Sequence, residues 1–299
     1  MAASHKLVRF DWAIKRLLRN KADYVVVEGL LTCLLGKQIK IKNLLESESN
    51  KETEDAKFNR VDILAEDENG ELIIFEIQND HQLDYFQRMA YGTSKTISEY
   101  LKEGEAYKNI KKLYSVNIVY FSLGQGDDYV YVGKTDFHSI HNPYEILALT
   151  PRQKEVFACD APSDIFPEYY LLRVDKFDEV ATTPLDEWIS FLKSGEIPET
   201  ATAPGLPEAR ERLREANLSD SEYRQYRREM DNLSNQESTL WSAEMKGEER
   251  GMIKGRAEGR AEGRAEGVLE TARNLKKLGV EISTIVTATG LSIEEIEKL

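Results

Sequence analysis

The stretch RVDILAEDENGELIIFEIQ, residues 60–78, decides the fold of this chain. Apolar residues bracket Asp62 in its first half and run directly into Glu76 in its second half, so each half is predicted to form a β-strand. Asn69-Gly70 between the halves is a turn signal and predicts a β-hairpin. Acidic residues inside apolar strands need an explanation, because a buried carboxylate without a cation or a basic partner is costly.

The length of the turn decides whether the two carboxylates meet. A two-residue turn at Asn69-Gly70 would place Asp62 opposite Ile77, and therefore on the other face of the hairpin from Glu76. A three-residue loop of residues 68–70, with its glycine in the left-handed conformation, would instead place Asp62 opposite Glu76. The sequence leaves these two registers open.

In the second register Gln78 shares the face of the two acidic residues. Two hard carboxylate ligands a few ångströms apart suit Mg²⁺, with Mn²⁺ as the other candidate. The structural alternative is that Asp62 lies in water at a strand end and Glu76 pairs with Arg60 or Arg88.

The composition is typical of a globular protein that is not secreted and does not coat nucleic acid. The chain has 299 residues, of which 41% are hydrophobic, and a net charge of −13. No apolar run approaches the roughly 20 residues of a membrane span, and the N-terminus lacks a signal-peptide pattern, so we expect a cytoplasmic protein without a membrane partner. Residues 1–50 carry a net charge of +4 and residues 51–100 one of −7, as expected if an acidic metal site lies beside a basic surface, although a solvated surface explains the same charges.

Strand and helix patterns interleave up to residue 195, which predicts a mixed α/β domain over residues 1–195. The acidic stretch 46–57 is expected to be mobile. Besides the hairpin, the patterns predict helices over residues 7–20, 22–35, 82–103 and 184–194, and strands over residues 113–121, 129–132 and 168–175.

The remaining third of the sequence predicts a mainly helical extension. Residues 196–207 are rich in proline and are predicted to be a linker, followed by a helical connector over residues 208–246. In residues 247–267 a glycine recurs every fourth position, which fits either a glycine-repeat helix paired with another helix or a flexible spacer. Residues 268–299 predict short helices, which we interpret as an oligomerisation or docking tail.

These residues resemble a known family. Asp62, the Glu76-x-Gln78 motif and the helix that follows, Gln87-Arg88-Met89-Ala90-Tyr91, are similar to the recombination-promoting nuclease and putative transposase family of the PD-(D/E)XK nuclease superfamily. The resemblance covers roughly residues 7–195, and a glycine-repeat tail is also frequent in that family. It implies a restriction-endonuclease-like fold, in which a mixed sheet is flanked by helices.

The resemblance also implies a chemistry and a set of residues. Asp62 and Glu76 would bind Mg²⁺, and the metal would activate water to cleave a DNA phosphodiester. Glu28 lies on an early helix, where the superfamily often places a further acidic ligand, although an exposed helical glutamate fits that position as well. At position 78 the superfamily usually has a lysine, whereas this chain has Gln78, which can form hydrogen bonds but carries no charge. We therefore expect Gln78, together with Arg88 as a source of positive charge, to complete the catalytic set.

The positive charge that lysine would provide has three candidate sources, Arg88, Lys95 and Arg60. We therefore expect an Mg²⁺-dependent DNA endonuclease connected with recombination or mobile elements, with DNA as substrate and a homo-oligomer formed through the C-terminal helical region. The alternative is a catalytically inactive nuclease-like module that binds DNA or protein.

Overall fold

The computed structural model describes residues 7–17, 21–45, 60–79, 81–101, 104–178 and 180–299, with the backbone alone at residues 15, 16, 22, 60–62, 216, 236, 237 and 244. The acidic stretch 46–57 lies outside the described residues, so its mobility stays a prediction. The chain divides into two compact units, Met1–Tyr226 and Arg227–Leu299. None of the helices in the described part of the chain is long and apolar enough to cross a membrane.

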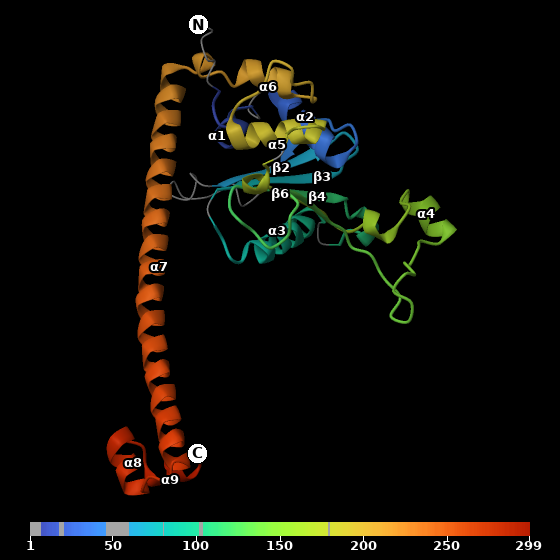
Figure 1. The fold of residues 1–299 in the computed structure, drawn as a ribbon. Coiled ribbons are helices and arrows are strands. Elements are labelled where there is room, and N and C mark those ends of the chain that lie inside the picture. Colours follow the sequence, from blue (N-terminus) through green and yellow to red (C-terminus); the bar gives the residue numbers. More distant parts are fainter. Residues whose placement is uncertain (1–6, 18–20, 46–59, 80, 102–103, 179) are drawn as a thin grey trace. The chain divides into compact units, whose positions relative to one another are not determined.

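A six-stranded mixed sheet forms the centre of the first unit, in the strand order β1-β2-β3-β4-β6-β5 (Figure 1). Strand β2 pairs antiparallel with β1 and with β3. Strand β4 pairs parallel with β3 and with β6, and β5 runs antiparallel to β6 at the edge. The strands are β1 (Ile41–Leu45), β2 (Arg60–Asp67), β3 (Leu72–Gln78), β4 (Leu113–Val119), β5 (Val130–Gly133) and β6 (Glu168–Arg173).

Helices cover both faces of the sheet (Figure 1). One face carries α1 (Phe10–Leu17), α2 (Tyr24–Leu35), α5 (Pro184–Ser194) and α6 (Leu206–Arg212), and the other carries α3 (Tyr85–Tyr100). The remaining helices are α4 (Pro151–Phe157), α7 (Asp220–Lys277), α8 (Ile282–Thr289) and α9 (Ile293–Glu297), with short 3-10 turns at Lys21–Asp23, Tyr107–Asn109, Pro162–Asp164, Val174–Lys176 and Glu215–Asn217.

Aromatic and aliphatic side chains fill both layers between helices and sheet. On the first face the ring of Phe10 packs edge-on against the rings of Phe75, Trp188 and Phe191. On the other face Tyr85, Met89, Val119, Phe121, Leu123 and Leu171 form a buried cluster. The apolar strand β3 is therefore buried along nearly its whole length, as a strand covered on both faces is.

The β2–β3 hairpin has the three-residue loop. The amide of Asp67 donates to the carbonyl of Glu71 at 3.0 Å, and the amide of Gly70 donates to the carbonyl of Asp67 at 3.1 Å. Gly70 has a φ of +79°, in the left-handed region that glycine adopts without strain. Asp62 consequently lies opposite Glu76 in the strand register, which confirms the second of the two registers left open by the sequence.

The other expected elements are found with shifted ends. Helix α3 ends at Tyr100 rather than near residue 103, because Leu101 already has an extended backbone. Strand β1 and the short helix α4 are absent from the expected elements, whereas α6 lies mostly in the predicted helical connector over residues 208–246. Strand β1 pairs with β2 through a register shift between Ile41 and Asn43, an irregularity that local sequence patterns do not indicate.

Residues 196–207, which composition predicts to be a linker, instead pack against α2 and α5. Ala203 and Leu206 are fully buried, and the indole of Trp188 donates to the carbonyl of Pro204 at 3.0 Å. Gly29 of α2 makes this contact possible, because a Cβ built there would lie 2.1 Å from the Pro204 carbonyl oxygen. The first compact unit therefore extends beyond residue 195, up to Tyr226.

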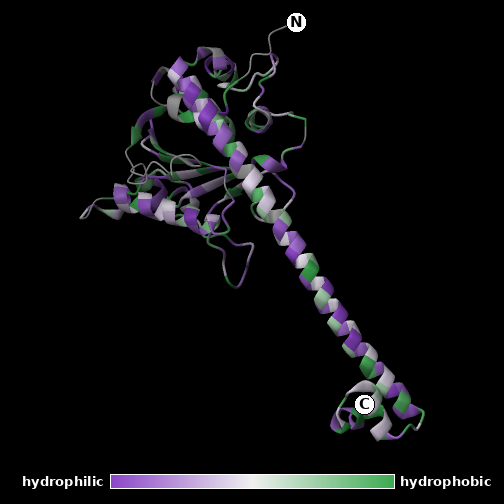
Figure 2. Cartoon of the chain, turned by 90° about the vertical axis from the view of Figure 1, so that its left-hand side faces the viewer, coloured by the Kyte–Doolittle hydropathy of each residue, from purple (hydrophilic) through white to green (hydrophobic). Residues whose placement is uncertain are grey.

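Helix α7 runs through the glycine repeat, so residues 247–267 are helical and do not form a flexible spacer. Its side chains are hydrophilic over most of its length (Figure 2). A capping box of Ser219 and Glu222 begins the helix. In the second unit Ala272, Ile285 and Ile296 form a small core that joins the end of α7 to α8 and α9.

Candidate active site

Glu76 is a buried carboxylate on the central strand β3, and it has a cationic partner on α3. The residue is 6% exposed, and its Oε1 lies 2.8 Å from a guanidinium nitrogen of Arg88. The other terminal nitrogen of Arg88 donates to Oε1 of Gln82 at 3.0 Å. The structure thus brings together two of the predicted site residues, Glu76 and Arg88.

The backbone of β2 places Asp62 next to Glu76. The two residues are direct partners in the antiparallel pair, and such partners lie about 4.5–5.5 Å apart at Cα with their side chains on the same face. The side chain of Asp62 is outside the described part of the chain. The register therefore supports a shared site, while the position of the Asp62 carboxylate stays a prediction.

Gln78 occupies the same face of β3, two residues after Glu76. The residue is 2% exposed, and its backbone carbonyl accepts a hydrogen bond from the backbone amide of Tyr120 at 3.1 Å. The neutral amide can donate and accept hydrogen bonds but carries no charge. The cation closest to the acidic group among the described contacts is therefore Arg88.

A polar pair on the neighbouring elements escaped the sequence analysis. Asn117 of β4 is fully buried and is the strand partner of Glu76. Its amide nitrogen donates to the carbonyl of Tyr170 and to two oxygens of Ser115, and its Oδ1 accepts from the hydroxyl of Tyr85 at 3.3 Å. The signal was a single asparagine inside the apolar run of residues 113–121. This network fixes β4 and α3 beside the acidic pair.

Glu28 has a different environment. Its Oε1 accepts from the amide of Ile41 at 2.9 Å, and its Oε2 lies 2.7 Å from the ammonium group of Lys40. These contacts connect α2 with the start of β1, and α2 covers the face of the sheet opposite α3 (Figure 1). The described contacts therefore do not bring Glu28 together with Glu76.

The two other candidate cations are also placed differently from Arg88. Lys95 lies one turn from Glu99 on α3, and the two form an ion pair of 3.6 Å. The side chain of Arg60 is outside the described part of the chain. Among the described side chains no three His, Cys, Asp or Glu residues gather into a group that could hold a metal, so a metal site here depends on Asp62.

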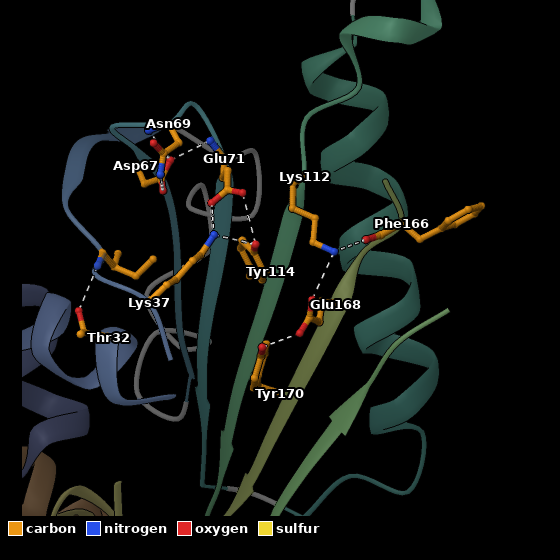
Figure 3. A network of polar contacts seen from close by, with 11 residues as sticks. Thr32, Lys37, Asp67, Asn69, Glu71, Lys112, Tyr114, Phe166, Glu168 and Tyr170 are labelled. Atoms are coloured by element: carbon orange, nitrogen blue, oxygen red, sulfur yellow. Dashed lines mark hydrogen bonds and ion pairs between the residues drawn. The ribbon is translucent and has the colours of Figure 1, made fainter. Parts of the chain in front are cut away.

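Two other carboxylates of the sheet provide a contrast, at the end of the strands where the hairpin turns (Figure 3). Glu71 pairs with Lys37 and accepts a hydrogen bond from Tyr114. Glu168 is bound by Lys112 and Lys134, and by the hydroxyl of Tyr170. Lysine side chains neutralise these carboxylates, so we interpret both as structural ion pairs.

The pKa of Glu168 reflects its lysine and tyrosine partners. Burial alone would raise the pKa, but the hydrogen bond from Tyr170 and the ammonium groups of Lys134 and Lys112 together hold it below its usual range. Glu168 is 7% exposed, almost the same as Glu76. It is therefore a matched reference for a buried strand carboxylate that lies outside the candidate site.

The donor set at the candidate site fits a divalent cation. A carboxylate that is buried on the sheet, with a second acidic residue directly opposite on the next strand, supplies the hard oxygen ligands that Mg²⁺ and Mn²⁺ prefer. Asp62 and Glu76 would hold the ion. In the absence of the ion, the guanidinium of Arg88 balances the charge of Glu76.

Comparison with known families agrees with this geometry. Residues 8–146 match the family model described as PD-(D/E)XK nuclease family transposase, and the match includes the hairpin, α3 and β4. No curated protein and no solved structure gives a significant match to the chain. The mixed sheet flanked by helices is the fold expected of this family. Residues 8–146 of this chain therefore belong to the PD-(D/E)XK nuclease family of transposases.

Proposed function

We propose that this protein is a DNA endonuclease that depends on a divalent metal, with Asp62 and Glu76 as the metal ligands. The observation that carries the proposal is the strand register, which sets Asp62 opposite a buried Glu76 on one face of the sheet. The family supports a nuclease that acts on DNA and has a role connected with mobile elements. Mg²⁺ is the proposed ion, with Mn²⁺ as a substitute.

A bound divalent ion would lower the pKa of its water ligand and stabilise negative charge on the phosphate. The protein has to hold the ion and the phosphodiester in the same place. Glu76 and Asp62 provide the anionic ligands, and their charge would then be balanced by the ion instead of by Arg88. This exchange frees the guanidinium of Arg88, a group suited to two-point recognition of phosphate, for the DNA backbone.

Gln78 has a positioning role in this scheme. Its buried amide lies on the same face as Glu76 and can accept and donate hydrogen bonds at once. A water molecule or a phosphate oxygen beside the metal ligands would be oriented by such a group. Because the amide is neutral, the positive charge for the phosphate comes from Arg88 and from the ion.

Nicking of supercoiled plasmid tests the proposal directly. Wild type, Glu76→Gln and Asp62→Asn are incubated with Mg²⁺, Mn²⁺, Ca²⁺ or EDTA, and Glu168→Gln serves as the control for loss of a buried strand carboxylate. We expect metal-dependent nicking by wild type and Glu168→Gln, and a loss of at least about a hundredfold in both site variants, since removing a metal ligand removes the ion. Equal nicking by Glu76→Gln and wild type would overturn the assignment.

The second candidate function is a module that binds DNA without cutting it. Two observations favour it: Arg88 occupies one oxygen of Glu76, and Gln78 stands where lysine is usual in the superfamily. This function predicts a gel shift of DNA in EDTA and no product with any metal. Product in Mg²⁺ that disappears with Glu76→Gln would exclude it.

A further inference from the structure

The sheet of the first unit ends in an edge strand, and an extended segment follows that strand. We call residues 134–167 the arm; it leaves β5, includes α4 and returns to β6, and it projects away from the sheet (Figure 1). Within the described residues, strand β5 pairs with β6 alone, and Tyr131 and Val132 on it are 37% and 50% exposed. An open edge followed by a projecting arm is a surface that can accept another chain.

The arm is structured but has no core of its own. Leu147 donates to the carbonyl of Phe137 at 2.9 Å, and Ser139 donates to that of Glu145 at 3.0 Å, while α4 has no buried residue. The large apolar side chains of the arm that are exposed are Phe137, Ile140, Tyr144, Ile146, Leu147, Val156, Phe157, Ile165 and Phe166. Ile140 and Tyr144 reach 93% and 95% exposure. An apolar surface of this kind marks a protein partner.

The charge of the arm argues against DNA as the occupant. Residues 134–167 contain three basic and five acidic side chains, so the segment is weakly acidic. Binding to a phosphate backbone depends on Lys and Arg side chains that neutralise it. The arm has fewer of them than acidic side chains and exposes large apolar ones, so we infer that its partner is another protein surface.

The backbone of β5 fixes how a partner strand could bind. The carbonyl of Tyr129 accepts a hydrogen bond from the amide of Arg173 on β6, so the odd-numbered residues of β5 direct their backbone amides and carbonyls toward β6. By the alternation of an antiparallel strand, Val130 and Val132 direct their amides and carbonyls to the open side. The amide of Val130 is bonded there only locally, to the side chain of Asp128 at 3.1 Å.

The charges at the two ends of β5 make the edge complementary to itself. In an antiparallel pair of two β5 strands centred on Tyr131, Val130 faces Val132 of the second copy, and Asp128 faces Lys134. Centring the pair on Val132 would instead oppose Asp128 to Asp136, which is repulsive. Lys134 is placed for such a contact, because its side chain is 53% exposed while it binds Glu168.

We propose that the open edge of β5 and the arm bind a second copy of this chain. The two β5 strands pair antiparallel about a twofold axis at Tyr131, which joins the two sheets, and each arm packs its apolar side chains against the partner. Such an interface is isologous, because each copy contributes the same surface. The proposal is independent of the nuclease function and of the helical tail.

Cysteine cross-linking tests the predicted register in the full-length protein. In a background with Cys33→Ser and Cys159→Ser, we expect Tyr131→Cys to form a disulfide between copies under mild oxidation. The two Tyr131 residues would be a non-hydrogen-bonded pair with Cα atoms about 4.5 Å apart, within the range of about 4.4–6.8 Å for disulfides. Val180→Cys, at a position 84% exposed in the same unit, is the control for random collision.

Two further variants test the axis. Val130→Cys alone and Val132→Cys alone should cross-link no faster than Val180→Cys, whereas a mixture of the two proteins should cross-link, because these positions face each other across the axis. Ile140→Ser with Leu147→Ser should reduce cross-linking through Tyr131→Cys several-fold. If Tyr131→Cys stays as reduced as Val180→Cys, or if all four positions cross-link at the same rate, the proposal is overturned.

Discussion

Oε1 of Glu76 lies 2.8 Å from the guanidinium of Arg88, so the buried acidic residue of the site already has a cation beside it. Both side chains are largely buried, at 8% and 20% exposure. A bound divalent ion would compete with the guanidinium for that oxygen. If a metal binds at Glu76 as proposed, the ion pair would be both a contact of the metal-free protein and a competitor of metal binding.

Replacing Arg88 by methionine separates these two effects. Without metal we expect Arg88→Met to be destabilised by about 2–3 kcal/mol, because loss of one partner from a buried pair leaves a charge that burial penalises. With Mg²⁺ or Mn²⁺ part of this loss should be recovered, since the ion replaces the guanidinium. The measurement is the melting temperature with EDTA and with metal. A metal-induced rise no larger than that of wild type would contradict the competition.

Nicking by the same variant gives a second readout of Arg88. If the guanidinium moves to the DNA phosphate, Arg88→Met should lose activity even in saturating metal. Arg88→Lys should recover part of it, because lysine keeps the charge but cannot form the two-point contact.

Introducing the lysine that is usual in the superfamily tests the role of Gln78. Gln78→Lys places an ammonium group on the face of Glu76, so we expect the single-turnover rate of nicking in Mg²⁺ to rise about tenfold, equal to about 1.4 kcal/mol of transition-state stabilisation. Gln78→Met has a similar length without charge or hydrogen bonds, and it should cleave more slowly than wild type. Equal rates for the lysine and methionine variants would show that charge at residue 78 has no effect.

The hairpin itself could be predicted from sequence, and its register limited to two choices, because both depend on local residues. Asn69-Gly70 and the length of the loop limit the choice to two registers, and Glu76 was already paired with Arg88 in the structural alternative. The roles of Asn117 and Tyr85 depend on a parallel pairing of β3 with β4 through a crossover, which local patterns do not specify. The packing of residues 196–207 was missed because their small and proline residues are typical of linkers, while their burial depends on a glycine of α2.

That glycine gives a sharp test of the packing. Gly29→Ala would bring a methyl group to 2.1 Å from the Pro204 carbonyl oxygen, so backbone must move and we expect a loss of about 3 kcal/mol or more. Gly92→Ala on α3 is the matched control, because a Cβ there meets nothing within 4 Å. In a helix interior that change should stabilise by roughly 0.5–1 kcal/mol. The two midpoints of urea unfolding should move in opposite directions; a shift of the same sign in both would refute the close contact.

Asp186, which belongs to the capping box of α5, is expected to make the free energy of unfolding depend on pH in the acidic range. Burial would raise its pKa, but the hydroxyl of Tyr129, at 2.5 Å, and the amides of Thr182 and Thr183 lower it to about 2. Because the folded pKa lies below the unfolded value of about 3.9, this carboxylate stabilises the fold fully above that value, and the contribution disappears as the pH falls toward 2.

We therefore expect Asp186→Asn to unfold at a lower urea concentration than wild type at pH 7, and the gap to narrow at pH 4 and further at pH 3. Thr183 also caps the helix by accepting from the amide of Asp186, so Thr183→Ala should lower stability by about 1 kcal/mol at pH 7. Because the Thr183 side chain is only one of the groups that lower the Asp186 pKa, more of this loss should remain at pH 3 than for Asp186→Asn. The comparison separates loss of a charge from loss of a cap. A gap for Asp186→Asn that stays constant from pH 7 to pH 3 would mean that the carboxylate contributes through its shape and hydrogen bonds, not through its ionisation.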